Sequence, residues 1–247
     1  MNAAEAIALP AVRTLVDDLT RELGDRLRSV VLYGSAARGD YQERTSDLNL
    51  LLVLNDLDAA ALDALAAPLA RWRRRGQPLP RLFTAELIAA SADVFPIEFL
   101  DLQRHRVVVT GDDPLAGVEI RRDHLRLQCE RELREKLMRL REGYLEAGGR
   151  PKELKRLLTG SYTTFLALFR GCLHLLGGEV PVHNEEVVEA FCARAGLDPL
   201  PFREIDRLKR GGPGGPGPAE LFARYYDEIR KAVRRVDRFQ PPQGGAA

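Results

Sequence analysis

Residues 30–54 read VVLYGSAARGDYQERTSDLNLLLVL, and this stretch decides the fold of the first half of the chain. A β-branched and aromatic run over residues 29–33 ends at Gly34, and an almost continuous apolar run follows over residues 48–54. The first run is typical of a strand, and the second of a strand that is covered on both faces. The polar, glycine-containing stretch between them predicts a connection that leaves the sheet and returns along a neighbouring strand.

The turn after the first predicted strand has the residues of a phosphate-binding site. Gly34 has no side chain, so a ligand can approach the backbone closely, and a helix is expected to begin at once, with exposed amides that suit a phosphate. Ser35 adds a hydroxyl donor, and Arg38 lies one helical turn further on. A guanidinium there offers a fork of N–H groups to phosphate oxygens.

The second predicted strand begins with a polar pair, Asp47 and Asn49. Because side chains alternate along a strand, this pair shares one face while Leu48 and Leu50 point into the core. A carboxylate on so apolar a strand needs a cation, and Mg²⁺ prefers oxygen ligands and commonly bridges a protein to substrate phosphates. We therefore expect Asp47 to hold Mg²⁺ beside the phosphate-binding turn.

These residues together resemble the signature of the DNA polymerase beta-like nucleotidyltransferase superfamily. In that signature Gly-Ser precedes Asp-x-Asp; here Gly34-Ser35 is followed, after eleven residues, by Asp47-Leu48-Asn49 within an apolar strand. The resemblance is sharp over residues 29–54 and looser to about residue 115. Beyond that point it depends on an all-helical second half, which is similar in outline to kanamycin nucleotidyltransferase.

The resemblance implies a reaction and a set of ligands. Gly34 and Ser35 would bind the triphosphate, Asp47 and Asn49 would hold Mg²⁺ or Mn²⁺, and a third carboxylate from a later strand would act as general base or metal ligand. The implied reaction transfers a nucleoside monophosphate, in the first instance AMP from ATP, to a hydroxyl of a small-molecule acceptor and releases pyrophosphate. The sequence identifies neither the acceptor nor the preferred nucleotide.

We choose Glu98 as the third carboxylate. Residues 96–102 are expected to form a strand in which Glu98 points away from the apolar side chains on either side of it. Glu98 would accept the proton of the acceptor hydroxyl, and the metal ligands would be Asp47, Asn49 and Glu98. A surface-edge glutamate is the alternative, and Asp101 competes because a bulge near Pro96 would change the register.

Asn49 departs from the family pattern, which has an acid at this position. An amide carbonyl can ligate Mg²⁺ but brings no negative charge, and two metal ions about 3.5–4 Å apart repel each other unless carboxylates neutralise them. A second ion should therefore be weakened. This leaves two hypotheses: an enzyme with one well-held ion, or a catalytically degenerate nucleotide-binding or antitoxin-like adaptor.

The hydrophobic period changes after Pro114. Before it, the pattern predicts helices over 12–27, 58–74 and 86–92, and strands over 29–33, 48–54, 81–83, 96–102 and 107–110. After it, the pattern predicts only helices, two of them long and ending at paired glycines. We expect an α+β fold: a small mixed sheet with flanking helices over residues 1–120, an all-α helical bundle over 121–239, and a flexible tail over 240–247.

Composition excludes several other classes of protein. The net charge of +1 argues against nucleic-acid binding, which usually needs an excess of Lys and Arg on one face. No apolar run approaches the roughly 20 residues that span a bilayer, and no secretory signal is expected at the N-terminus. The three cysteines are widely spaced and unlike a disulfide or zinc framework, so we expect buried thiols in a cytoplasmic protein. Oligomerisation remains open.

Overall fold

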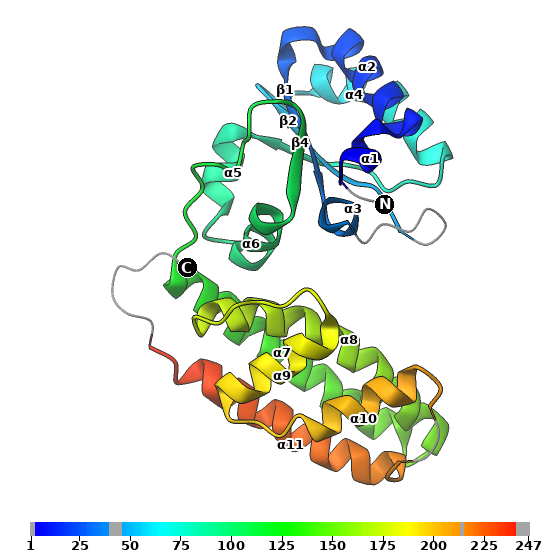
Figure 1. Ribbon diagram of the computed structural model, residues 1–247, viewed down its shortest axis with the longest axis vertical. Coiled ribbons are helices and arrows are strands. Elements are labelled where there is room, and N and C mark those ends of the chain that lie inside the picture. Colours follow the sequence, from blue (N-terminus) through cyan, green and yellow to red (C-terminus); the bar gives the residue numbers. More distant parts are fainter. Residues whose placement is uncertain (1–2, 40–45, 213–214, 241–247) are drawn as a thin grey trace. The chain divides into compact units, whose positions relative to one another are not determined.

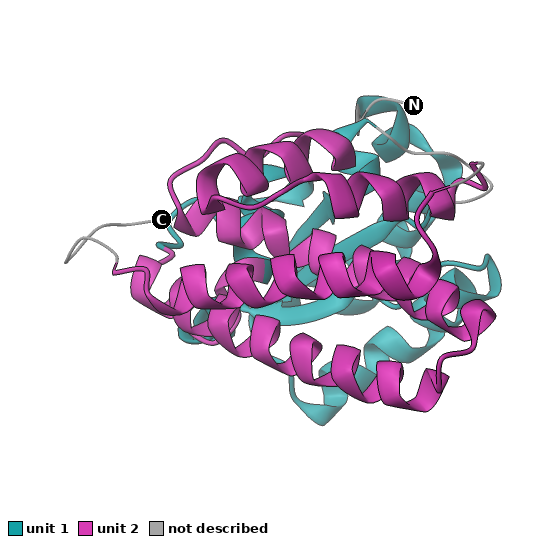
Figure 2. Cartoon of the chain, turned by 90° about the horizontal axis from the view of Figure 1, so that it is seen from below, with its two compact units in different colours: residues 1–92, 98–119 teal, residues 93–97, 120–247 magenta. Residues whose placement is uncertain are grey.

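The computed structural model describes residues 3–39, 46–212 and 215–240, and it divides the chain into two compact units (Figure 2). The first unit comprises residues 1–92 and 98–119, and the second comprises residues 93–97 and 120–247. The expected boundary, near residue 120, lies where the chain passes from the first unit into the second. Residues 93–97 interrupt the first unit along the sequence and belong to the second unit.

A four-stranded mixed sheet forms the centre of the first unit, with the strand order β3-β2-β1-β4. Strand β1 is antiparallel to both β2 and β4, whereas β2 and β3 run parallel. The expected mixed sheet is thus confirmed. The strands are β1 (Leu27–Tyr33), β2 (Asn49–Leu54), β3 (Arg81–Thr84) and β4 (Arg106–Gly111).

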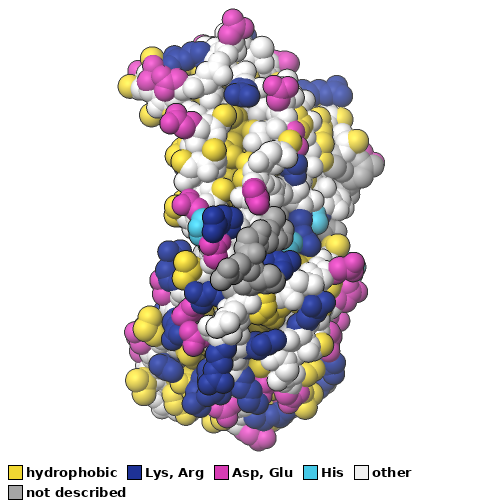
Figure 3. Space-filling view, turned by 90° about the vertical axis from the view of Figure 1, so that its left-hand side faces the viewer, with side chains coloured by type: hydrophobic (Ala, Val, Ile, Leu, Met, Phe, Trp, Pro, Cys, Tyr) yellow, Lys and Arg dark blue, Asp and Glu magenta, His cyan; other side chains and the backbone are white. Residues whose placement is uncertain are grey.

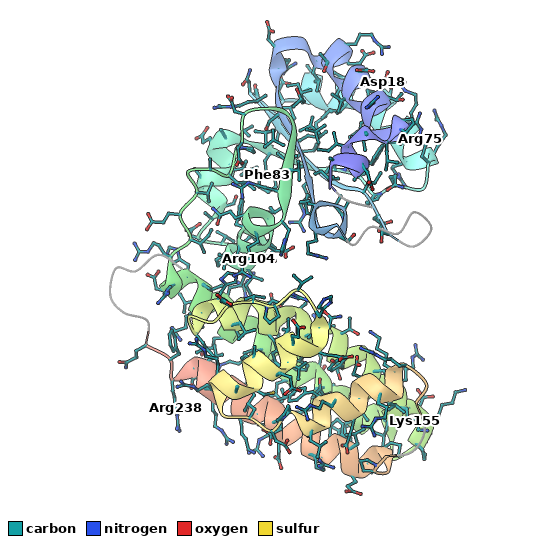
Figure 4. All side chains as sticks on the ribbon, viewed as in Figure 1. Asp18, Arg75, Phe83, Arg104, Lys155 and Arg238 are labelled. Atoms are coloured by element: carbon teal, nitrogen blue, oxygen red, sulfur yellow. The ribbon has the colours of Figure 1, made fainter. Side chains whose placement is uncertain are left out.

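Helices cover both faces of this sheet (Figure 1). On one face lie α1 (Ala3–Ala8), α2 (Pro10–Leu23) and α4 (Ala59–Arg74); on the other lie α5 (Ala85–Ser91) and α6 (Pro96–Arg104). A single short helix, α3 (Ser35–Arg38), follows β1 directly. On the second face Phe83 of β3, labelled in Figure 4, packs edge-on against Phe99 of α6 with ring centroids 5.9 Å apart.

The alternation along β2 fixes which side chains enter the main core. Leu48, Leu50, Leu52 and Leu54 join the cluster that α2 and α4 cover. Burial of each such side chain stabilises the fold by about 1.5–3 kcal/mol. The intervening positions, from Asn49 onward, therefore face the opposite side of the sheet.

An ion-pair cluster joins α2 to α4 on the outer side of the core. The buried carboxylate of Asp18, labelled in Figure 4, accepts from Arg21 at 2.7 Å on its own helix and pairs with Arg71 of α4 at 2.9 Å. The hydrogen bond from Arg71 is the largest cause that holds the pKa of Asp18 below its ordinary value; burial opposes it and Arg21 adds to it.

We expect Asp18→Asn to lower the urea midpoint of unfolding at pH 7. A carboxyl whose pKa is depressed in the folded state stabilises that state above the pKa of the unfolded chain, and this stabilisation is lost as the pH falls through the folded pKa. The difference between wild type and variant should therefore narrow below about pH 4. Asp17→Asn is the matched control, because Asp17 is exposed and makes no ion pair with the residues described. A difference in urea midpoint that does not change with pH would contradict stabilisation by the ionised Asp18 carboxylate.

Two predicted elements are wrong in their extent or type. The helix expected over 12–27 ends at Leu23, because Gly24 adopts a φ of 52° that closes it, and a strand begins at Leu27. The strand expected over 96–102 is the helix α6. Pro96 is its first residue, a position at which the N–H has no acceptor inside the helix. The amide of Ile97, which also lacks an acceptor inside the helix, donates to the side-chain oxygen of Gln128 at 2.8 Å.

The second unit is the expected all-helical bundle. Its helices are α7 (Arg122–Ala147), α8 (Pro151–Leu175), α9 (Asn184–Ala195), α10 (Leu200–Lys209) and α11 (Pro218–Asp237). A chain of aromatic contacts forms its centre: Phe169 stacks on Phe191 at 4.2 Å, and Phe202 meets Tyr225 edge-on at 5.5 Å. Of the tail expected over 240–247, residues 241–247 lie outside the described residues.

Other expectations from composition can be compared with the structure. All three cysteines are buried, as expected of thiols that serve as small apolar side chains. Positive and negative side chains are interspersed over the face drawn in Figure 3. Among the helices of the described ranges, none has a stretch apolar and long enough to span a bilayer.

Candidate active site

The site forms where β1 ends and β2 begins. Tyr33, the last residue of β1, pairs with Asn49, the first residue of β2, so the residues that follow one and precede the other lie at the same edge of the sheet. Gly34, with φ 77° and ψ −147°, turns the chain out of β1, and helix α3 starts immediately after it. The structure therefore brings together the Gly34-Ser35 turn and the Asp47–Asn49 segment.

The turn depends on a glycine for two reasons. Its backbone conformation is one that only glycine adopts readily. A Cβ at Gly34 would also stand 3.2 Å from Nδ2 of Asn49, so the turn and the half-buried amide are in direct proximity. The amides of Ala37 and Arg38 both donate to the Gly34 carbonyl at 3.1 Å, which leaves the amides of Ser35 and Ala36 at the start of α3 without an acceptor inside the helix.

Asp47 lies two residues before Asn49, in the segment that leads into β2. Its backbone neighbour is well held, because Leu48 is buried and its amide donates to Oε1 of Gln77 at 2.8 Å. The Asp47 side chain is exposed, and within the described part of the chain it has no hydrogen bond or ion pair. An exposed carboxylate on a well-held segment, without a partner among the described residues, can serve as a ligand to a cation.

A cationic and aromatic pair that the sequence analysis did not identify borders this edge. The guanidinium carbon of Arg81 lies 5.8 Å from the ring centroid of Tyr33. Burial raises the pKa of Tyr33, the positive charge of Arg81 partly offsets this, and the negative charge of Asp101 adds to it.

The remaining predicted residues lie on helices. Arg38 is the exposed last residue of α3. Glu98 is half-buried in the first turn of α6, and Asp101, its competitor, follows one helical turn later. The negative charge of Asp101 adds to the raised pKa of Tyr33. Within the described ranges, no three His, Cys, Asp or Glu side chains gather closely enough to hold a metal.

The donor set fits one divalent ion better than two. Among the described residues 34–39 and 46–49, it offers one carboxylate, Asp47, and one amide, Asn49, with a turn suited to phosphate. Mg²⁺ is commonly bound by one or two carboxylates together with substrate phosphates and water, so this set is sufficient for a single ion that arrives with a nucleotide. A pair of ions would need further carboxylates to neutralise their repulsion.

The helical unit has a cavity of its own, of about 800 Å³. Its charged side chains pair across it: Arg203 of α10 forms a two-pronged ion pair with Glu189 of α9, and Arg210 bonds both Glu185 and Asp206. Tyr162 of α8 lines the same cavity, and burial raises the pKa of its hydroxyl. These pairs fix α9 against α10, so most of the charge in the cavity is already neutralised.

No protein-family model and no curated protein sequence matches the chain. The fold of the chain is, however, similar to that of solved structures. The chain superposes on spectinomycin adenyltransferase AAD(9) from Enterococcus faecialis, solved with ATP and spectinomycin, with a TM-score of 0.52 and 13% sequence identity, over 92% of this chain and 98% of that one. The chain has a nucleotidyltransferase fold. This confirms the fold that the resemblance implied, the α+β first half and the helical second half together.

A toxin–antitoxin structure solved with AMP-PNP is similar to a smaller part of the chain. The match covers 42% of this chain and 76% of that one, with 18% identity and a TM-score of 0.29. The fold assignment depends on the adenyltransferase alone, because its match covers nearly the whole of both chains.

Proposed function

We propose that this protein is a nucleotidyltransferase that transfers a nucleoside monophosphate, AMP from ATP, to a hydroxyl of a small-molecule acceptor. One observation carries the proposal: the Gly34 turn lies against Asn49, and two residues before Asn49 lies the exposed carboxylate of Asp47, which has no ion pair with any described residue. A bound Mg²⁺ or Mn²⁺ would neutralise phosphate charge at this edge. The nucleotidyltransferase fold and a match to a structure solved with ATP support the same function.

The residues of this edge have separable roles in the proposal. The Gly34-Ser35 turn receives the phosphates through backbone amides and the Ser35 hydroxyl, and Arg38 adds positive charge. Asp47 anchors the divalent ion, with Asn49 as a neutral neighbour. In-line displacement at the α-phosphorus is mainly a matter of positioning and charge neutralisation, which this arrangement supports. A cytoplasmic location is consistent with three unpaired thiols.

Either Asp101 or Glu98 would accept the proton from the acceptor. Asp101 is tested first because it is exposed on α6 and its charge adds to the raised pKa of Tyr33, which pairs with Asn49 in the sheet. We expect Asp101→Asn to lower turnover by about 10²- to 10⁴-fold, as for loss of a general base. Glu98→Gln, on the same helix, is the matched comparison. A large loss in Glu98→Gln with Asp101→Asn unaffected would return the role to Glu98.

Radiolabelled ATP with Mg²⁺ or Mn²⁺ and a panel of hydroxylated acceptors tests the proposal directly. The expected result is release of pyrophosphate together with label on one class of acceptor. Wild-type protein that binds no nucleotide by calorimetry, with either ion, would defeat it.

A degenerate nucleotide-binding adaptor is the second candidate. Asn49 and the lack of a three-ligand cluster among the described residues favour it. The same experiment separates the two functions: an adaptor would retain nucleotide binding and release no pyrophosphate with any acceptor.

A further inference from the structure

We propose that Arg81 is a nucleotide-binding residue, whose guanidinium contacts the phosphate chain at the place where a second divalent ion would otherwise stand. This inference depends on the proposed function, because it names a further residue of the same nucleotide site. It arises from the sheet topology, the charge of the residues around Asn49 and the chemistry of the guanidinium group.

The topology places the Arg81 side chain across the start of β2. Strand β2 lies between β3, which carries Arg81, and β1, which carries Tyr33. Neighbouring strands are about 4.8 Å apart, so β3 and β1 are separated by roughly 10 Å. A guanidinium on β3 that lies 5.8 Å from the Tyr33 ring must therefore extend over β2.

The strand registers define where the Arg81 side chain crosses β2. Arg81 pairs with Leu51, and Tyr33 pairs with Asn49, so all four side chains share the face of the sheet opposite the α2–α4 core. The side chain consequently runs from beside Leu51 toward Asn49. The positive charge comes to lie near the residue at which the family pattern has an acid.

The guanidinium N–H donors of Arg81 are available to a ligand. Arg81 is exposed and lies over the ring of Tyr33; within the described part of the chain it forms no ion pair with a carboxylate. Arg106, which pairs with Tyr33 from the other side in β4, is different: its guanidinium grips Asp113 at 2.7 to 3.1 Å. Of these two flanking cations, Arg81 is the one whose donors remain available to a ligand.

The chemistry of this group suits a polyphosphate. A guanidinium presents several N–H donors in a planar fork, stays charged at any physiological pH and forms two parallel hydrogen bonds to phosphate oxygens. The contact with the Tyr33 ring restricts the motion of the guanidinium, which lowers the entropy that is lost on binding.

The same geometry gives a physical reason for Asn49. A carboxylate at position 49 would pair with the guanidinium and withdraw it from the nucleotide, whereas a neutral amide leaves it available. Asn49 and Arg81 are then complementary: the amide lacks the negative charge that a second metal ion needs, and the guanidinium supplies positive charge without a metal.

Calorimetric titration with α,β-methylene-ATP and Mg²⁺ tests the role of Arg81. We expect Arg81→Gln to raise the Kd of the nucleotide by about 10- to 100-fold, the range for loss of hydrogen bonds to a charged group. Arg81→Lys should recover only part of the affinity, because an ammonium cannot form the fork. Arg28→Gln is the matched control, since Arg28 is an exposed arginine of β1 outside the nucleotide site. Circular dichroism establishes that each variant is folded.

The number of Mn²⁺ ions bound with the same nucleotide, read by electron paramagnetic resonance, is the second measurement. Wild type and Asn49→Asp should each bind one ion, because the new carboxylate pairs with Arg81. The double variant Asn49→Asp with Arg81→Gln should bind two.

The outcomes separate this inference from the function on which it depends. If wild type binds no nucleotide, both are lost. If wild type binds and Arg81→Gln binds within twofold of it, Arg81 has no part in the site and the proposed function stands. A second ion in Asn49→Asp alone would also overturn the inference, because it would show that the guanidinium does not occupy that place.

Discussion

Asp47→Asn is expected to lower the rate of pyrophosphate release by about 10²- to 10³-fold, the range for removal of one preorganised electrostatic group from an active site. The substitution preserves size and removes the charge. Asp47 is exposed in the segment that leads into β2, and it has no ion pair with the residues described, so its charge remains available to a cation. The Mg²⁺ concentration for half-maximal rate should rise, while thermal stability should stay within about 0.5 kcal/mol of wild type, as for other exposed positions.

Asp56→Asn is the control for this experiment. Asp56 is also an exposed aspartate close to β2, but it follows the far end of the strand, after Leu54. Its removal changes the net charge by the same amount and should leave both the rate and the Mg²⁺ requirement unchanged. Equal losses in the two variants would show that net charge, and not a specific ligand, governs the rate.

The second large effect is expected at Gly34. Gly34→Ala forces a side chain into a conformation with φ 77° and ψ −147°, at a cost of about 1–3 kcal/mol in unfolding free energy. The new Cβ also presses on Asn49 Nδ2 at 3.2 Å and covers the backbone at which the phosphates would lie. We therefore expect the Kd for nucleotide to rise at least about tenfold, which corresponds to 1.4 kcal/mol. Urea unfolding and calorimetry measure the two effects separately.

Gly39→Ala distinguishes strain from steric blockage. Gly39 ends α3 with a φ of 89°, so a side chain there is strained as well, but a Cβ would meet no atom of the described residues within 4 Å. Its substitution should cost about 1–2 kcal/mol of stability and leave nucleotide affinity unaltered. A comparable loss of nucleotide affinity in both variants would mean that the turn acts only through its stability.

A helix occupies the region that had been predicted to carry the third carboxylate on a strand. Alternation and helical spacing are hard to separate over a few residues, and several apolar side chains near Glu98 fit both periods. The deciding signal was Pro96, which cannot donate to a sheet ladder and suits the first position of a helix. Since that segment is α6, the relation of Glu98 and Asp101 to the active edge follows helix packing and not strand register.

The amino-acid sequence by itself determined the parts of this protein whose signals are local. Strongly apolar β2, the glycine turn into α3 and the long amphipathic helices all follow from neighbouring residues, and the nucleotidyltransferase resemblance came from residues close together in the chain. The proximity of Gly34 to Asn49 also follows from local pairing, because β1 and β2 are adjacent antiparallel strands.

Only the tertiary structure decided which distant residues join that edge. Arg81 lies far along the chain from Tyr33, and the two meet because β3 pairs in parallel with β2, a choice made by sheet topology and not by any motif around residue 81. Likewise, Asp101 reaches Tyr33 because α6 packs over that face of the sheet. Long-range strand pairing depends on burial of whole surfaces. The positive charge of Arg81 near Asn49 is therefore apparent only in the folded chain.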